Sequence, residues 1–187
     1  IAGFLFLGRG DEVILGEPYW DNYEMTFTFA CEAMLRPFPL FEGSGFNLAE
    51  FREACRSAQG KIVVFLNFPN NPTGYTPTVE EAAAIVAAIR EVAESGRNIL
   101  VILDDAYFGL VYEDGVSRES LFAPLASLHE RVLTVKIDGC TKEDYAWGLR
   151  VGFVTFAGKG MTPGALQALE EKAAGIVRAT VSNASHL

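Results

Sequence analysis

The residue with the clearest chemical potential in this sequence is a lysine that follows a strand-like run. Leu133–Ile137 is rich in apolar and β-branched residues, which predicts a buried strand, and Asp138-Gly139 is typical of a turn after it. Lys142 comes directly after this turn. A lysine amine can form a Schiff base with a carbonyl compound, but only when it is deprotonated, and a free lysine titrates at about 10.4. A solvated loop lysine is the alternative, because lysine is almost never fully buried.

Two polar stretches follow two other predicted strands. Lys61–Leu66 and Asn98–Leu103 are continuous apolar runs, as expected for strands buried on both faces of a parallel sheet. The first runs into Asn67-Phe-Pro-Asn-Asn-Pro-Thr-Gly74, and the second into Asp104-Asp105-Ala106-Tyr107. Two acids after a buried strand are costly unless they have a partner. Because ligands bind at the carboxyl ends of strands in open α/β sheets, both stretches are candidate site residues.

With Lys142 and, eight residues later, Arg150, these stretches stand in a recognisable order and spacing. The sequence resembles the fold-type I pyridoxal-phosphate enzymes of the aspartate aminotransferase superfamily, class I and II, along nearly the whole chain. The resemblance implies that Lys142 forms a Schiff base with pyridoxal 5′-phosphate and that Asp104 faces the pyridine nitrogen. It further implies that Asn71 and Tyr107 hydrogen-bond the phenolic oxygen, and that Arg150 grips the phosphate through its planar fork.

An aromatic cluster and one departure complete the expected site. Trp20 lies two residues after Pro18, in a run that the residues alone would assign to core packing. The resemblance instead implies that Trp20 stacks on the face of the cofactor ring. The family commonly has serine three residues before the lysine, where its hydroxyl meets the phosphate, but here that position is Gly139. Our hypothesis is that Thr141 supplies the replacement hydroxyl.

The resemblance implies an aminotransferase that moves an amino group from an amino acid to a 2-oxo acid, with Lys142 as the acid and base. Residues 1–187 would form the central part of the cofactor-binding large domain. The family's phosphate loop would precede this part, and its small C-terminal domain, with the arginine that binds the substrate carboxylate, would follow. We expect a homodimer for the full-length protein, because the family's active site borrows residues across a dimer interface.

Two other functions stay open at this point. A lyase or decarboxylase of the same fold would use the same cofactor residues, and the C-terminal arginine would discriminate between them. A non-catalytic regulatory domain could keep the pocket as a sensor, and an upstream helix-turn-helix segment would support it.

Composition restricts the partners. The formal net charge of −9 argues against nucleic acid or an anionic membrane as a partner. The three cysteines, Cys31, Cys55 and Cys140, are far apart, and there are only two histidines, so no metal site is expected and a reducing, cytoplasmic setting fits best. The apolar stretch at Ile1 is too short to span a bilayer.

The remaining pattern predicts the fold class. Strands alternate with helices, which indicates an α/β protein with a mostly parallel open sheet and helices on both faces. Three helix starts carry capping residues, at Asn47, Thr78 and Thr162. Met34–Leu40 contains two prolines, which favours a strand near an edge of the sheet. Pro18 suits the first turn of a helix, which we expect to run to about Cys31. Arg150–Phe156 is expected to form a further strand.

Overall fold

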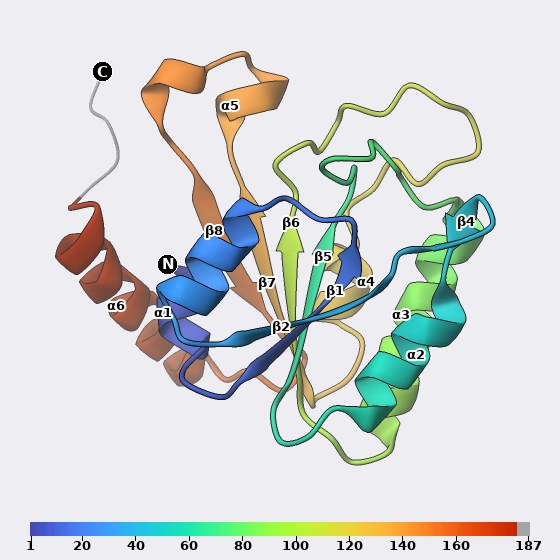
Figure 1. Cartoon of the computed structure of the whole chain (residues 1–187). Coiled ribbons are helices and arrows are strands. Elements are labelled where there is room, and N and C mark those ends of the chain that lie inside the picture. Colours follow the sequence, from blue (N-terminus) through green and yellow to red (C-terminus); the bar gives the residue numbers. More distant parts are fainter. Residues whose placement is uncertain (183–187) are drawn as a thin grey trace.

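The structure is a computed structural model that describes residues 1–182, so that Asn183–Ser185, which matches a glycosylation sequon, and His186 lie outside it. Its centre is a six-stranded sheet in the order β2-β1-β5-β6-β7-β8 (Figure 1). Five strands are parallel, and β8 runs antiparallel to β7. The strands are β1 (Glu12–Glu17), β2 (Met34–Pro39), β5 (Ile62–Asn67), β6 (Ile99–Asp104), β7 (Val132–Asp138) and β8 (Phe153–Ala157). A separate hairpin pairs β3 (Phe41–Glu42) with β4 (Gly45–Phe46).

Helices cover both faces of this sheet, as predicted (Figure 1). One face carries α2 (Leu48–Ser57), α3 (Val79–Glu94) and α4 (Phe122–Ala126). The other face carries α1 (Ala2–Phe6), the π-helix η1 (Glu24–Phe29) and α6 (Pro163–Thr180). Two short elements, α5 (Cys140–Glu143) and the 3₁₀ helix η2 (Trp147–Leu149), rise beyond the sheet between β7 and β8, in orange in Figure 1. The predicted fold class is confirmed.

The central strands β5 and β6 separate two apolar clusters. Successive side chains of a strand point to opposite faces, so Val64 and Leu66 pack against α2 and α3 while Val63 and Phe65 pack against α1 and η1. Every residue of β5 is buried, which confirms the prediction of a strand covered on both faces. The larger cluster includes Phe51 of α2, which is fully buried.

The predicted capping residues begin their helices. The Asn47 side chain accepts a hydrogen bond from the backbone N–H of Glu50, and Thr78 forms a reciprocal capping box with Glu81. Thr162 likewise accepts from the N–H of Ala165 at the start of α6. The proline-containing strand β2 lies at the edge of the sheet, where a missing N–H leaves no neighbour unpaired.

Two predicted elements differ from the structure. The helix expected to open at Pro18 and run to Cys31 begins only after Asp21 and has π geometry over η1. The strand expected from Arg150 begins at Phe153 instead, because Arg150 adopts a left-handed conformation (φ 54°) after η2. This turn reverses the chain, so that β8 can return antiparallel to β7.

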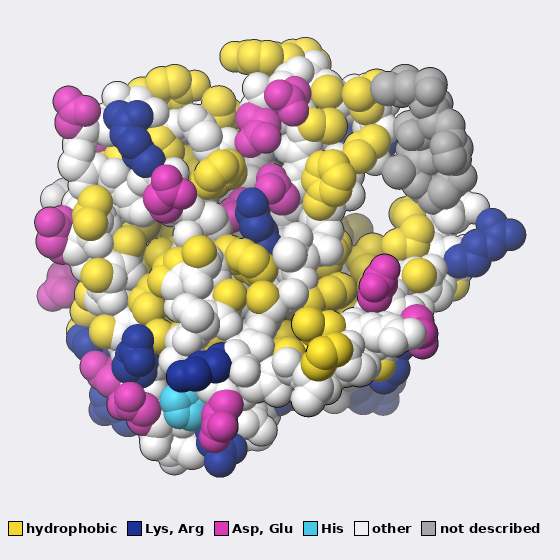
Figure 2. Space-filling view, turned by 180° about the vertical axis from the view of Figure 1, so that it is seen from behind, with side chains coloured by type: hydrophobic (Ala, Val, Ile, Leu, Met, Phe, Trp, Pro, Cys, Tyr) yellow, Lys and Arg dark blue, Asp and Glu magenta, His cyan; other side chains and the backbone are white. Residues whose placement is uncertain are grey.

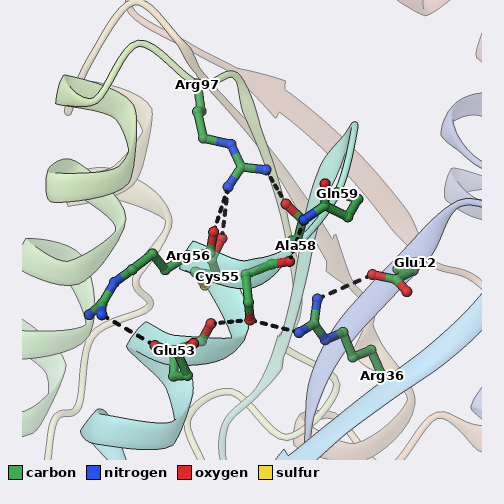
Figure 3. A network of polar contacts seen from close by, with 9 residues as sticks. Glu12, Arg36, Glu53, Cys55, Arg56, Ala58, Gln59 and Arg97 are labelled. Carbon is green, nitrogen blue, oxygen red and sulfur yellow. Dashed lines mark hydrogen bonds and ion pairs between the residues drawn. The ribbon is translucent and has the colours of Figure 1, made fainter.

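Near the amino ends of the strands, away from the candidate site, arginine side chains bind the end of α2 and a neighbouring strand (Figure 3). Arg97 donates hydrogen bonds to the carbonyl groups of Cys55, Arg56 and Ala58, at 3.2, 3.0 and 2.5 Å, and so satisfies the C-terminal end of α2. Nearby, Arg36 pairs with Glu12 at 3.2 Å and donates a hydrogen bond of 2.7 Å to the hydroxyl of Ser57, the last residue of α2. Arg97 and Arg36 therefore hold the C-terminal end of α2, from which the chain continues into β5.

Within residues 1–182, no helix is both long enough and apolar enough to cross a bilayer. The same part of the chain contains no cluster of three or more His, Cys, Asp or Glu side chains that could hold a metal ion.

Candidate active site

Three parallel strands end side by side at the carboxyl edge of the sheet. Asn67 of β5 is in register with Asp104 of β6, and Asp104 is in register with Ile137 of β7. The Asn67 side chain donates a hydrogen bond of 2.8 Å to the carbonyl oxygen of Asp104, and the N–H of Asp105 donates one of 2.9 Å to the carbonyl oxygen of Ile137. The strand ends are therefore tied together by side-chain and backbone bonds.

The carboxylate of Asp104 is held from two sides. Its Oδ2 accepts a hydrogen bond of 2.7 Å from the hydroxyl of Tyr23, and its Oδ1 accepts one of 3.0 Å from the N–H of Ala106. Burial raises the pKa of Tyr23, and the charge of Asp104 raises it further, so Tyr23 remains a protonated donor. The ring of Trp20, which is 45% exposed, meets the Tyr23 ring edge-on at 5.7 Å between centroids. Trp20 therefore lies one side chain away from Asp104.

The two successive acids face opposite sides of the sheet. Asp104 meets Tyr23 on the face of α1 and η1, whereas Asp105 lies near Lys136 on the face of α4. Asp105 is only 6% exposed, and burial raises its pKa to about 6, although Ser120 and Lys136 act in the opposite direction. Asp105 is thus a buried acid, and only Asp104 faces the Trp20 side.

The asparagine pair that follows β5 has divided roles. The buried Asn70 accepts hydrogen bonds from the N–H and hydroxyl of Thr73, at 3.3 and 2.7 Å, as expected for a turn residue. Asn71 is half-buried, and its N–H donates a bond of 2.7 Å to the side chain of Asn67. Because Asn67 also bonds the end of β6, Asn71 is coupled to the Asp104 strand end through one side chain.

Lys142 lies over Tyr107. Its Nζ is 4.5 Å from the centroid of the Tyr107 ring, within the range of a cation–π contact. The lysine, Thr141 and Arg150 line one open cavity of about 240 Å³, together with Ala106, Ile137, Asp138, Gly139, Val151 and Gly152. The remaining candidate residues, Asn71, Asp104, Tyr107 and Trp20, do not line this cavity. Tyr107 contacts the lining residue Lys142 and Asp104 bonds the N–H of the lining residue Ala106, whereas Asn71 and Trp20 are linked to Asp104 indirectly, through Asn67 and Tyr23.

Two glycines bring Lys142 and Arg150 together. A Cβ atom added to Gly139 would lie 2.9 Å from the carbonyl oxygen of Val151, and one added to Gly152 would lie 3.2 Å from that of Asp138. The chain on either side of the α5–η2 excursion therefore approaches closely because it carries no side chains there. A side chain at position 139, such as the serine that the resemblance led us to expect, would meet the backbone of Val151.

The chemistry of these groups fits pyridoxal phosphate. Lys142 offers an amine, Arg150 a guanidinium group and Thr141 a hydroxyl around one cavity, which suits an amine-reactive aldehyde beside a phosphate. Asp104, fixed by Tyr23, is a carboxylate suited to a protonated pyridine nitrogen.

Sequence reasoning did not find Tyr23. The available signal was its position three residues after Trp20, which places both on one side of a helical turn.

The comparisons with known proteins agree with this geometry. The family model for aminotransferase class I and II matches residues 1–186. The chain is 34% identical over 152 residues to a probable N-acetyl-LL-diaminopimelate aminotransferase of Bacillus subtilis, covering 79% of this chain and 34% of that protein. It is 32% identical over 152 residues to a probable aspartate/prephenate aminotransferase of Aquifex aeolicus, covering 79% and 35%.

A solved aminotransferase structure from Anaerococcus prevotii superimposes with a TM-score of 0.86 at 27% identity, over 99% of this chain and 46% of that one. The chain thus spans about a third of the length of the curated relatives it matches. The family match, the fold and the grouping of Lys142, Arg150 and Asp104 at one sheet edge agree: the chain belongs to the class I and II aminotransferases.

Proposed function

We propose that this chain is the central part of the cofactor-binding large domain of an aminotransferase that moves amino groups between an amino acid and a 2-oxo acid. The observation that carries the proposal is the cavity that Lys142, Thr141 and Arg150 line, beside the Tyr23-bound carboxylate of Asp104. Members of this family depend on pyridoxal phosphate. When bound, this cofactor supplies an aldehyde that accepts amino groups and a ring that withdraws electrons.

The residues of this chain would divide the work as follows. Arg150 and Thr141 would hold the phosphate, and Asp104 would keep the pyridine nitrogen protonated. Asn71 and Tyr107 would donate hydrogen bonds to the phenolic oxygen. The exposed face of Trp20 would cover the ring on one side.

Lys142 would act at the reacting atoms. Its Nζ would be the amine that holds the cofactor aldehyde. As a free amine, Lys142 would be the base and acid that moves a proton between the substrate Cα and the adjacent cofactor carbon. Its place at the cavity wall, 4.5 Å from the Tyr107 ring, supports this role.

Two features of the full-length protein belong to the same proposal. We propose a homodimer in which a second subunit completes the site. We also propose a cytoplasmic location, which the three free cysteines of this chain support. Light scattering of the full-length protein would test the dimer, and a monomer with full activity would contradict it.

The experiment that tests the function is a single half-reaction in the full-length protein loaded with pyridoxal phosphate. A panel of amino acids is added without an oxo acid, and the products are identified. An aminotransferase releases one 2-oxo acid per site, whereas a decarboxylase or lyase releases carbon dioxide or another fragment over many turnovers. Lys142→Ala should abolish the release, and Lys159→Ala, which changes an exposed turn lysine, should not. Release of another product, or an active Lys142→Ala protein, would refute the proposal.

A further inference from the structure

Lys136 is a charged residue to which the proposed function assigns no role. It lies within β7, in register with Leu103 of β6, and its side chain is only 19% exposed. A lysine with so little contact with water is rare unless it is paired. Its partners therefore indicate what it does.

Acidic groups surround this lysine. Its Nζ is 2.6 Å from Oδ2 of Asp138 and 3.8 Å from Oδ2 of Asp105, and Glu143 adds a further negative charge. The Phe108 ring lies on one side, with its centroid 5.0 Å from Nζ. Burial lowers the pKa of Lys136, but the hydrogen bond to Asp138 and the nearby acids outweigh this effect and raise it. Lys136 is therefore a cation at neutral pH.

Asp138 joins Lys136 to the segment that carries Lys142. Its Oδ2 binds Lys136, while its Oδ1 accepts a hydrogen bond of 2.8 Å from the N–H of Gly139. Gly139 is the N-cap residue of α5, and Lys142 lies in α5. One carboxylate thus links the cation inside the sheet to the first peptide of the reactive turn.

Few other contacts can hold this turn. No residue from 139 to 152 is buried, so the segment has little apolar packing against the core. On the β6 side, Asp105 fixes its own N–H to the carbonyl of Ile137 and presents its carboxylate to Lys136. Lys136 therefore lies between the carboxylates of Asp105, which follows β6, and Asp138, the last residue of β7 before the turn.

We propose that Lys136 is a positioning residue that holds, through Asp138, the turn bearing Lys142 against the carboxyl end of β6. This inference rests on the proposed function, which makes Lys142 the reacting amine. A displacement of about 1 Å at a reacting group can cost about a hundredfold in rate. Loss of Lys136 should therefore lower kcat more than it changes KM.

The first test follows the turn itself, without cofactor. In the full-length protein, hydrogen exchange of the amides of residues 139–144 is compared between the parent, Lys136→Met and Lys61→Met. Lys61 is a matched control, because its Nζ also lies 2.6 Å from a carboxylate, that of Asp11, at the opposite edge of the sheet. We expect Lys136→Met alone to speed exchange of these amides about tenfold, and Lys136→Arg to restore it.

The second test uses the cofactor-loaded protein. Removal of the cation leaves Asp105, Asp138 and Glu143 uncompensated near Lys142, which favours a protonated amine. The pH midpoint of the visible absorption of the lysine-bound cofactor should therefore rise in Lys136→Met, and kcat should fall about tenfold to a hundredfold. A general loss of stability would not shift the pH midpoint of the absorption. Lys61→Met should leave both this midpoint and kcat unchanged.

The outcomes separate the two proposals. Unchanged exchange of residues 139–144 in Lys136→Met overturns the positioning role, whatever the activity. Equal losses of kcat in Lys136→Met and Lys61→Met also overturn it. If Lys136→Met loosens the turn but the parent never binds cofactor at Lys142, the proposed function fails while the anchoring of the turn stands.

Discussion

The two halves of the candidate site are built in different ways. Asn67, Asp104 and Tyr23 are tied to one another by hydrogen bonds of 2.7–2.8 Å at the end of a buried sheet. Lys142 and Arg150 lie instead in a segment that rises beyond the sheet and contains no buried residue. Figure 2 shows hydrophobic side chains, among acidic ones, on the upper surface of the molecule seen from behind. Within the segment itself, Tyr145 and Trp147 are 69% and 59% exposed.

Under the proposed function, this difference would separate the residues that tune the cofactor ring from those that react. A carboxylate that must keep its charge beside a ring nitrogen benefits from fixed donors and a rigid strand end. An amine that must leave and rejoin a carbon needs room to move, which the open cavity at Lys142 provides. Exposed apolar side chains such as Tyr145 and Trp147 are typical of surfaces that contact another protein surface.

The largest expected effect tests the contrast in burial. Phe51 is fully buried in the α2 cluster, whereas Phe153 of β8 is 57% exposed. Phe51→Ala should lower the free energy of unfolding by about 3–5 kcal/mol, because it leaves a cavity. Phe153→Ala should change it by less than about 0.5 kcal/mol. Urea unfolding measures the free energy of unfolding of both variants. Equal losses in the two would contradict the difference in packing between the α2 cluster and β8.

The next effect concerns Asp105 and pH. Burial raises its pKa to about 6, above the ordinary 3.8, so the folded protein binds this proton more tightly than the unfolded chain. The resulting stability is present below about pH 4 and is lost as pH rises toward 6, by about 3 kcal/mol. Asp105→Asn should lack this loss. Urea unfolding at several pH values gives the difference in the free energy of unfolding between the parent and Asp105→Asn. If this difference stays constant from pH 4 to 7, the pKa of Asp105 is not raised by burial.

A smaller effect tests the half of the site that hydrogen bonds hold together, which contains Asn67, Asp104 and Tyr23. Tyr23→Phe removes the hydroxyl that donates to Asp104 at 2.7 Å and keeps the ring that packs on Trp20. A hydrogen bond to a charged group contributes about 1.5–3 kcal/mol, so kcat/KM should fall roughly tenfold to a hundredfold. Tyr19→Phe, which removes the exposed bond to Glu24, is the control. Equal activity of the two variants would indicate that Tyr23 does not support Asp104.

The smallest expected effect concerns the other half of the site, the exposed segment that carries Lys142 and Arg150. Thr141 lines the cavity with Lys142 and Arg150, and our hypothesis gives its hydroxyl to the cofactor phosphate. Thr141→Val should weaken cofactor binding about fivefold, as expected for one hydrogen bond of about 1 kcal/mol. Thr155→Val, at an exposed position of β8, is the control. Titration with pyridoxal phosphate measures both, and an unchanged dissociation constant for Thr141→Val would end the hypothesis.

Local patterns were sufficient to predict the sheet. The apolar runs that became β5 and β6, and the caps at Asn47 and Thr78, depend on neighbours in sequence, and the structure confirms them. The edge position of β2 followed from its two prolines.

Features that depend on distant partners could not be predicted. Tyr23 gains its role from Asp104, 81 residues away. Lys136 lies in an apolar strand, and one of its two acidic partners, Asp105, follows the neighbouring strand. The left-handed turn at Arg150 likewise depends on the close approach of Gly139 and Gly152, which no local propensity encodes.

Borohydride reduction tests most directly whether Lys142 is the amine that binds the cofactor. The full-length protein is incubated with pyridoxal phosphate, reduced, digested and analysed by mass spectrometry. We expect the cofactor mass on the peptide that contains Lys142, its loss in Lys142→Ala, and its retention in Lys159→Ala. Labelling of another lysine, such as Lys136, or no specific labelling in the parent protein, would contradict it.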